Sequence, residues 1–343
     1  MLRGIMTSLM PALGLAFFMV SLLLAGCGQP EGLRLAGMQG TASWHVTLTD
    51  VPDGLEATTL QAGISTAFAN SSQLLAGWDQ TSEISRFNQH EGTDWFPVSP
   101  LLAQLVSTAL QLSEQSGGSY DVTVGPLIKL WGFSAEQVKD QVPAQAEVDA
   151  VRAKVGYQKL QARLDPPALR KSRADVSVDL ASMADGFATD MAGEYLESVG
   201  IHNYMVEIAG EIRARGLSPR GDPWRIAIEK PLGNERAVQQ GIKLQNAALA
   251  TSGDYRNFFM QGGKRYSHTL DPQTGFPVAH QLASVSVLAE NGTLADAYAT
   301  LLMSLGEVKG KVFAEQHGLA AYFIWREGDG LQTYATEAFA RVF

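Results

Sequence analysis

The chain contains a single cysteine among its 343 residues. One thiol cannot close an intrachain disulfide, so disulfides contribute nothing to the stability of this fold. Zinc sites built from several thiolates and iron–sulfur clusters are excluded for the same reason. The six histidines show no spacing typical of a zinc site.

Three common nucleotide-binding and hydrolase motifs are also missing. The chain has no Gly-x-Gly-x-x-Gly, no Gly-x-x-x-x-Gly-Lys-Ser/Thr and no Gly-x-Ser-x-Gly. Positive charge is scarce, because the formal net charge is −9 and no basic cluster is present. This balance argues against nucleic-acid binding. Hydrophobic residues make up 45% of the chain and charged residues 18%, which is typical of a globular protein with a substantial core.

The first residues resemble an export signal. Arg3 precedes an apolar run from Leu9 to Leu24, and small residues then lead to Cys27. This pattern indicates a secretory signal and not a retained transmembrane helix. The Leu-Ala-Gly-Cys ending resembles the lipobox of bacterial lipoproteins, in which the cysteine is lipidated. An ordinary signal peptide with a chance cysteine is the alternative, but lipidation explains a lone cysteine in an exported protein.

We therefore expect three segments. They are a lipoprotein signal peptide over residues 1–26, a lipidated Cys27 with a tether over 27–36, and one large unit over 37–343. Helices and strands alternate irregularly along that unit, with hairpins between them, which favours an α+β fold with antiparallel-rich sheets. Two intimate subdomains within the single unit are also compatible with its length.

Hydrophobic periodicity predicts the individual elements. Helices are expected over residues 55–75, 100–116, 147–155, 183–199 and 294–305. Strands are expected over residues 44–48, 120–124, 176–179, 204–208, 224–228, 283–288 and 320–325.

A polar loop over residues 266–277 collects the side chains best suited to chemistry. It carries His268, Asp271 and Thr274, and Pro272 and Gly275 stiffen and bend it. The preceding Gly-Gly pair at 262–263 predicts a hairpin turn that would aim this loop. An ordinary surface loop is the alternative reading.

A carboxylate and a hydroxyl lie four residues apart at Asp296 and Thr300, on a predicted helix. This spacing places both oxygens on one helical face, and such hard donors suit Mg²⁺ or Ca²⁺. Asp296 also lies near the helix start, where it would offset the helix dipole without binding metal.

A strand-to-helix junction over residues 179–190 is the second polar constellation. Ser182 is placed to cap the helix, and Gly186 would let a ligand or a second backbone approach closely. A capped helix with a packing glycine is the alternative. Around residues 119–124, Asp121 and Thr123 are expected to point outward from the buried valines between them. Trp131 and Phe133 either wall a flat ligand or belong to the core.

Taken together, six stretches resemble the bacterial FAD:protein FMN transferases, which are periplasm-facing lipoproteins once regarded as thiamine-biosynthesis lipoproteins. Each stretch is weak evidence alone, but the set follows the family order from about Gly37 to the end. The stretches are Ser82–Asn88, Tyr120–Pro126, Leu130–Phe133, Thr251–Arg256, Ser267–Gly275 and Ala295–Thr300.

The resemblance implies Mg²⁺-dependent cleavage of the FAD pyrophosphate. FMN would pass to a threonine hydroxyl of an acceptor protein, typically a subunit of a membrane redox complex, and AMP would leave. A metal suits this reaction because it neutralises charge at the pyrophosphate. A lipoprotein that binds FAD, or hydrolyses it to FMN and AMP without an acceptor, is the alternative. The expected location is the bacterial envelope, lipid-anchored at the inner membrane and facing the periplasm.

The resemblance also assigns residues. The metal ligands fall on Asp296, Thr300 and the backbone carbonyl of Ser182, and the catalytic positions on His268 and Asp271. For His268, acid–base and positioning roles both stay open. The FAD contacts fall on Gln39, Trp78, Ser119, Tyr120, Asp121, Asp179, Asp185 and Leu270.

Three positions depart from the family pattern. The usual Met-Gly-Thr reads Gln39-Gly-Thr here, and Asp185 stands where lysine or glutamate is common. Ala299 replaces an aspartate that some members have before the metal threonine. Because this leaves fewer charged ligands, we expect lower metal affinity or more retained water.

Overall fold

The computed structural model describes residues 32–134, 137–138, 140–233 and 237–342. The expected signal peptide, Cys27 and the start of the tether lie outside the described residues. Across the part of the chain that is described, none of the helices combines the length and the apolar character needed to cross a membrane.

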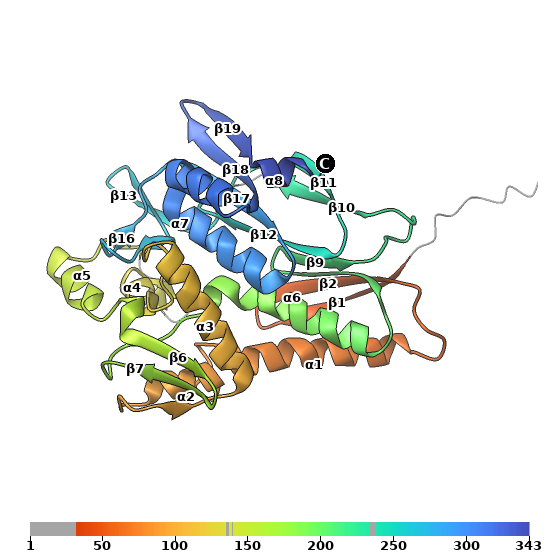
Figure 1. The fold of residues 1–343 in the computed structure, drawn as a ribbon. Coiled ribbons are helices and arrows are strands. Elements are labelled where there is room, and N and C mark those ends of the chain that lie inside the picture. The colour runs from red at the N-terminus through yellow and green to blue at the C-terminus, as the bar shows by residue number, and fades with distance from the viewer. Residues whose placement is uncertain (1–31, 135–136, 139, 234–236, 343) are drawn as a thin grey trace, which may run out of the picture.

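An eight-stranded sheet runs through the centre of the molecule (Figure 1). Each strand is antiparallel to its neighbours, so the expected α+β class with antiparallel pairing is confirmed. In spatial order the strands are β1 (Leu33–Gln39), β2 (Ala42–Thr49), β8 (Asn203–Ile208), β9 (Glu211–Arg215), β12 (Ala247–Gly253), β17 (Leu282–Ala289), β18 (Ala320–Glu327) and β19 (Gly330–Ala335).

Three long helices, α1 (Ala57–Leu75), α6 (Ala181–Ser198) and α7 (Gly292–Gln316), pack against one face of this sheet (Figure 1). In α1 the buried positions recur every three or four residues, as an amphipathic helix requires, and they pack on β2 and β8. In α7 the buried residues pack on β12, β17 and β18. The helices predicted at 55–75, 183–199 and 294–305 are therefore confirmed.

Two glycines let α6 and α7 touch backbone to backbone. A Cβ atom on Gly186 would lie 2.0 Å from the carbonyl oxygen of Gly292, so no larger residue fits there. Of the two approaches expected at Gly186, the structure shows that of a second backbone. The contact brings the N-terminal parts of both helices together, and these parts carry the predicted metal-binding residues Ser182, Asp296 and Thr300.

The opposite face of the sheet is covered by a hairpin and a short helix. The hairpin strands are β10 (Trp224–Glu229) and β11 (Val238–Leu244), and the helix is α8 (Glu337–Ala340). Apolar side chains of all three elements form one cluster with β12, β17 and β18. The central strands are therefore buried on both faces, which explains why β17 is apolar almost throughout.

A smaller layer lies beside the helical face (Figure 1). Its helix α3 (Pro100–Gln115) begins as the sequence predicts, with the Ser99 hydroxyl accepting a hydrogen bond from the Leu102 N–H at 3.2 Å. The other elements of this layer are α2 (Glu83–Gln89), β3 (Phe96–Pro97), α4 (Gly125–Leu130), β4 (Phe133–Ser134), β5 (Gln137–Val138), α5 (Gln145–Arg152), η1 (Tyr157–Lys159), β6 (Leu160–Leu164), β7 (Pro167–Lys171), β13 (Phe258–Gln261), β14 (Lys264–Ser267), β15 (Leu270–Asp271) and β16 (Phe276–Pro277).

Trp131 of this layer belongs to the core and not to a ligand wall. Trp131 is fully buried, and its indole N–H donates to the Gly275 carbonyl at 2.8 Å. Its ring packs against Phe259, Tyr266 and Phe276. Of the two readings given for Trp131, the structure supports the core. The hairpin predicted at 262–263 is confirmed as β13–β14.

Two predicted strands are wrong. Residues 120–124 form a turn, because the Asp121 side chain accepts both the N–H and the hydroxyl of Thr123, and α4 follows at once. Residues 176–179 are extended but belong to no sheet, since the Asn88 side chain bonds both the N–H and the carbonyl of Val178. The two segments share one backbone hydrogen bond, from the Asp179 N–H to the Val122 carbonyl at 2.7 Å, and side chains take the place of a longer strand ladder.

Candidate active site

The small cavity lies where the start of α6, the N-terminal half of α7 and the loop after β12 meet. The large cavity adjoins it and is bordered by α1, α6 and strands β8, β9 and β10. The large cavity has a volume of about 1130 Å³ and the small cavity one of about 400 Å³. Four residues line both and form what we call the shared wall: Asp179, Ala181, Thr251 and Arg256.

The small cavity gathers most of the predicted site. Asp296 and Thr300 line it from α7, Ser182 from α6, and His268 and Leu270 from the polar loop. The segment after α3 contributes three further predicted positions, Ser119, Tyr120 and Asp121. Residues from four distant parts of the sequence therefore converge on one space.

Asp296 is a buried carboxylate with few hydrogen-bond partners and no ion-pair partner among the described residues. It is 7% exposed, and its Oδ2 accepts a hydrogen bond from the Gly186 N–H at 3.1 Å. Burial raises the pKa of Asp296 to about 7, and the nearby charge of Asp185 acts in the same direction. A cation at this carboxylate would offset both effects.

The oxygen donors around Asp296 fit Mg²⁺. The Thr300 hydroxyl lies 3.3 Å from the Ser252 hydroxyl, and Ser182 lines the same space. Carboxylate, hydroxyl and carbonyl oxygens are the hard donors that Mg²⁺ takes together with phosphate and water. No group of three or more His, Cys, Asp or Glu side chains within the described ranges could enclose a metal. The donor set is therefore a mixed one, with Asp296 supplying the charge.

Ser182 does not cap α6, contrary to the prediction. The Ala181 N–H at the helix start donates to Asp179 Oδ1 at 2.9 Å instead. The Ser182 hydroxyl lies 2.8 Å from the hydroxyl of Tyr120, which is buried. Burial raises the pKa of Tyr120, so this phenol keeps its proton and can donate to a neighbouring oxygen.

Asp121 and Thr123 point inward and not outward, because the predicted strand is a turn. Asp121 is buried, and besides Thr123 it accepts the Tyr157 N–H at 2.7 Å. Burial raises the pKa of Asp121 although these hydrogen bonds oppose the change. The Asp121 carboxylate lines the small cavity and also holds the surrounding turn in place through these hydrogen bonds.

His268 is held at one ring nitrogen. Its Nδ1 lies 3.1 Å from the carbonyl oxygen of Asn257, and the imidazole lines the small cavity. Burial lowers the pKa of His268, so the ring is neutral near pH 7. His268 thus shares a cavity with Asp296 and Thr300.

Asp271 and Thr274 bend the loop. Asp271 Oδ1 accepts the Gln273 N–H at 2.9 Å, and the Asp271 carbonyl accepts the Gly275 N–H at 2.8 Å. The Thr274 hydroxyl accepts the Phe276 N–H at 3.3 Å. The loop is internally bonded, as its proline and glycine indicate, and Asp271 shapes the segment that carries His268.

The large cavity receives the remaining predicted positions. Gln39, Trp78 and Asp185 line it, and Trp78 is 63% exposed. Gln39 donates to the Ser72 hydroxyl at 2.9 Å, whereas the neighbouring Met38 is 61% exposed. Where the family pattern has Met-Gly-Thr and this chain has Gln39-Gly-Thr, the side chain that lines the cavity is therefore Gln39 and not Met38.

Two charged lining residues, Glu211 and Arg256, lie in stretches that drew attention in the sequence but received no role there. Glu211 is buried on β9, and burial, followed by the charges of Asp296 and Asp185, raises its pKa well above the ordinary value. Arg256 belongs to the shared wall. The Thr251–Arg256 stretch contributed to the resemblance, but its arginine received no role. The local sign of Glu211 is Gly210 before it, because a glycine that interrupts a strand often marks the close approach of a ligand.

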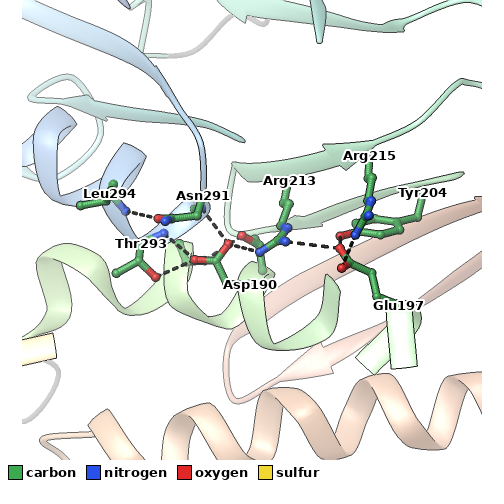
Figure 2. A network of polar contacts seen from close by, with 11 residues as sticks. Asp190, Glu197, Tyr204, Arg213, Arg215, Asn291, Thr293 and Leu294 are labelled. Carbon is green, nitrogen blue, oxygen red and sulfur yellow. Dashed lines mark hydrogen bonds and ion pairs between the residues drawn. The ribbon is translucent and has the colours of Figure 1, made fainter. Parts of the chain in front are cut away.

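A polar network fixes the start of α7 on α6 (Figure 2). Asp190 of α6 accepts the Gly292 N–H and the Thr293 N–H, each at 2.8 Å, and so satisfies amides that the helix itself leaves free. Arg213 of β9 donates to the same carboxylate at 2.7 Å and also contacts Glu197. Asp296 lies one turn beyond this clamp of Asp190 and Arg213.

Comparisons with known proteins agree on one family. The sequence model of the ApbE family matches residues 40–323. The FAD:protein FMN transferase of Vibrio cholerae is 41% identical over 319 residues, covering 93% of this chain and 95% of the relative. That of Escherichia coli is 36% identical over 335 residues, covering 94% and 95%.

Solved structures give the same result. The flavin transferase ApbE from Vibrio cholerae superposes with a TM-score of 0.84 at 39% identity, covering 91% of this chain and 99% of that one. The apo form of the Pseudomonas stutzeri flavinyl transferase ApbE gives a TM-score of 0.83 at 36% identity, covering 91% and 97%.

Proposed function

The chain belongs to the ApbE family, and on that premise we propose that it transfers FMN from FAD to a threonine hydroxyl of an acceptor protein, in a Mg²⁺-dependent reaction that releases AMP. The observation that carries the chemistry is the small cavity, where Asp296, Thr300 and His268 line one space. The large cavity beside it has about 1130 Å³, slightly above the roughly 300–1,000 Å³ typical of small-molecule sites, which leaves room for a large part of a dinucleotide.

Asp296, Thr300 and the Ser182 carbonyl would hold Mg²⁺ against the pyrophosphate of FAD. Bound there, the ion supplies positive charge that offsets the charge developing on the phosphate oxygens. Tyr120 keeps its proton and shares a hydrogen bond with the Ser182 hydroxyl, so one of these two O–H groups is left to donate to an oxygen of the bound substrate.

His268 is suited to take the proton of the incoming threonine. A carbonyl oxygen can only accept, so the contact with Asn257 places the ring hydrogen on Nδ1 and leaves Nε2 with a free lone pair. The threonine oxygen then bonds to the phosphorus of the FMN half while the bond from that phosphorus to the bridging oxygen breaks. AMP leaves with the bridging oxygen, and the threonine proton passes to Nε2.

The partners and the location form part of the same proposal. Typical acceptors would be flavoprotein subunits of membrane redox complexes. Cys27 would carry the lipid that holds the domain at the periplasmic side of the bacterial inner membrane. The support is the lipobox-like sequence before Cys27 and the short tether after it.

One experiment tests the activity. The purified protein is incubated with FAD, MgCl₂ and a flavoprotein subunit of a membrane redox complex, and covalent flavin is followed by in-gel fluorescence and intact mass. We expect the acceptor to gain the mass of FMN less water, and the labelling to stop with EDTA or when the acceptor threonine is replaced by alanine. Release of AMP and FMN without labelling would favour the FAD-hydrolysing alternative.

A further inference from the structure

The two cavities are strongly acidic for a site that takes an anionic dinucleotide. Five carboxylate residues line the large cavity, among them Asp185, Glu211 and Glu229, and Asp296 adds to them from the small one. Among the described residues that line either cavity, Arg256 is the single lysine or arginine. A negatively charged pyrophosphate entering this field needs cationic partners, because like charges at close range are unfavourable.

Arg256 stands at the one place where it serves both cavities. It belongs to the shared wall, together with Asp179 and Thr251. A dinucleotide that spans the two spaces must pass this wall with the pyrophosphate at its middle. The flavin and adenosine ends would then lie to either side.

The base of the loop that carries Arg256 is held by several hydrogen bonds. Two residues earlier, Asp254 is buried and accepts two hydrogen bonds from Arg326, at 2.9 and 2.7 Å. The Asp254 N–H donates to the Ala283 carbonyl of β17 at 3.0 Å, and Arg265 donates to the Asp254 carbonyl. These bonds fix the base of the loop two residues before Arg256, so the guanidinium starts from a defined place at the shared wall.

The present partner of Arg256 is easily exchanged. The guanidinium contacts Glu229 of β10, and the side chains are 58% and 27% exposed. Ion pairs this exposed add little to stability. A phosphate group binds the planar guanidinium through paired, charge-assisted hydrogen bonds, which are stronger.

We propose that Arg256 binds the pyrophosphate of FAD at the shared wall, and that Glu229 is its counterion until FAD takes its place. This inference rests on the proposed function for the identity of the substrate. It makes Arg256 a substrate-binding residue of the reaction and Glu229 a residue that weakens FAD binding.

The test is FAD affinity, measured on the full chain by quenching of flavin fluorescence. Arg256→Gln should weaken FAD binding by about tenfold to a hundredfold, as loss of a charged hydrogen-bond partner does. Riboflavin, which has no phosphate, should bind both proteins equally. Arg256→Lys should recover part of the affinity, because it restores the charge but not the planar fork. The matched control is Arg225→Gln on β10, which breaks the exposed pair of Arg225 with Asp222 and should leave FAD affinity unchanged.

Glu229→Gln gives an independent result that does not depend on the arginine variant being folded. Removing the counterion should tighten FAD binding up to about fivefold, the range set by an exposed ion pair. Inorganic pyrophosphate should compete with FAD more effectively in this variant.

Three results would overturn the proposal: FAD affinity within twofold of wild type in Arg256→Gln, an equal loss for riboflavin, or weaker FAD binding in Glu229→Gln. Each leaves the proposed function intact if the wild-type protein still labels an acceptor. Conversely, a wild-type protein that binds FAD through Arg256 but labels nothing would refute the transfer and keep this inference.

Discussion

At the scale of single residues, His268 has the surroundings of a group that moves a proton. One ring nitrogen is bonded to the Asn257 carbonyl, and the other is available to a substrate in the small cavity. We predict that His268→Ala lowers the rate of FMN transfer by about 10²–10⁴-fold, the range for general acid–base groups, with little change in FAD affinity. Rates and fluorescence titrations check this, with the exposed His202→Ala as control. A rate within a few-fold of wild type would make His268 a packing residue.

The pH dependence of transfer follows from the same residue. Burial lowers the pKa of His268 below its ordinary value of 6.5. A base must be unprotonated, so the rate should rise with pH through that lowered pKa and level off before neutrality. A stopped-assay profile between pH 4.5 and 8, roughly, would show this limb, which should vanish in His268→Ala. The profile is measured at saturating Mg²⁺, which keeps Asp296 ionised, and a limb centred above pH 6.5 would then contradict the assignment.

Site residues that lie close together in the sequence could be recognised from their spacing. Site residues that only the fold brings together could not. Asp296 and Thr300 share a helix face by spacing alone, and His268 sits in a loop marked by proline and glycine. Glu211 and Arg256 reach the cavities from β9 and from the loop after β12, which the sheet places beside each other. That adjacency is a property of strand pairing and leaves no local pattern.

At the scale of elements, hydrophobic periodicity predicted the helices that have an apolar face. It failed where side chains bond the backbone groups that a neighbouring strand would otherwise bond. Residues 120–124 and 176–179 have the valines of a strand. Their backbone groups instead bond the side chains of Asp121 and Asn88. Such bonds compete with a sheet ladder, and their partners can be distant, as Asn88 is from Val178.

The α6–α7 pair is the element on which the site depends, and the Asp190 clamp tests it. We predict that Asp190→Asn costs about 1–3 kcal/mol of unfolding free energy, because a buried donor on Arg213, Gly292 or Thr293 loses its acceptor. The Mg²⁺ concentration needed for AMP release should rise as well, since the start of α7 is no longer fixed on α6. Denaturant unfolding and Mg²⁺ titration measure the two effects.

The matched control for the clamp is Asp175→Asn, which breaks an exposed pair with Arg173. Its melting temperature and Mg²⁺ requirement should match wild type. If Asp190→Asn behaves in the same way, the clamp does not position Asp296.

At the scale of the whole molecule, the fold class was predictable but the strand order was not. The mixture of hairpins and helices indicated antiparallel α+β packing. The sheet pairs β2 with β8 and β9 with β12, which brings together strands separated by helices and hairpins in the sequence. The two cavities lie among elements that only this order makes neighbours.

The membrane attachment is also a property of the whole chain. We predict that a protein beginning at Gly28 is soluble without detergent and transfers FMN at the full-length rate, because Cys27 serves only as the lipid site. Fractionation and labelling assays of the two forms check this. If the shortened protein is folded but inactive, the segment before Gly28 has a further duty.

The most direct test of the central claim, that Asp296 holds Mg²⁺ at the pyrophosphate, is AMP release by Asp296→Asn. Asparagine keeps the oxygen that accepts the Gly186 N–H but removes the charge. We predict that Mg²⁺-dependent AMP release falls by at least roughly a hundredfold, because several kcal/mol of charge stabilisation are lost. The melting temperature should stay near that of wild type. Normal AMP release with an unchanged Mg²⁺ requirement would contradict the account and leave Asp296 as a helix-start residue.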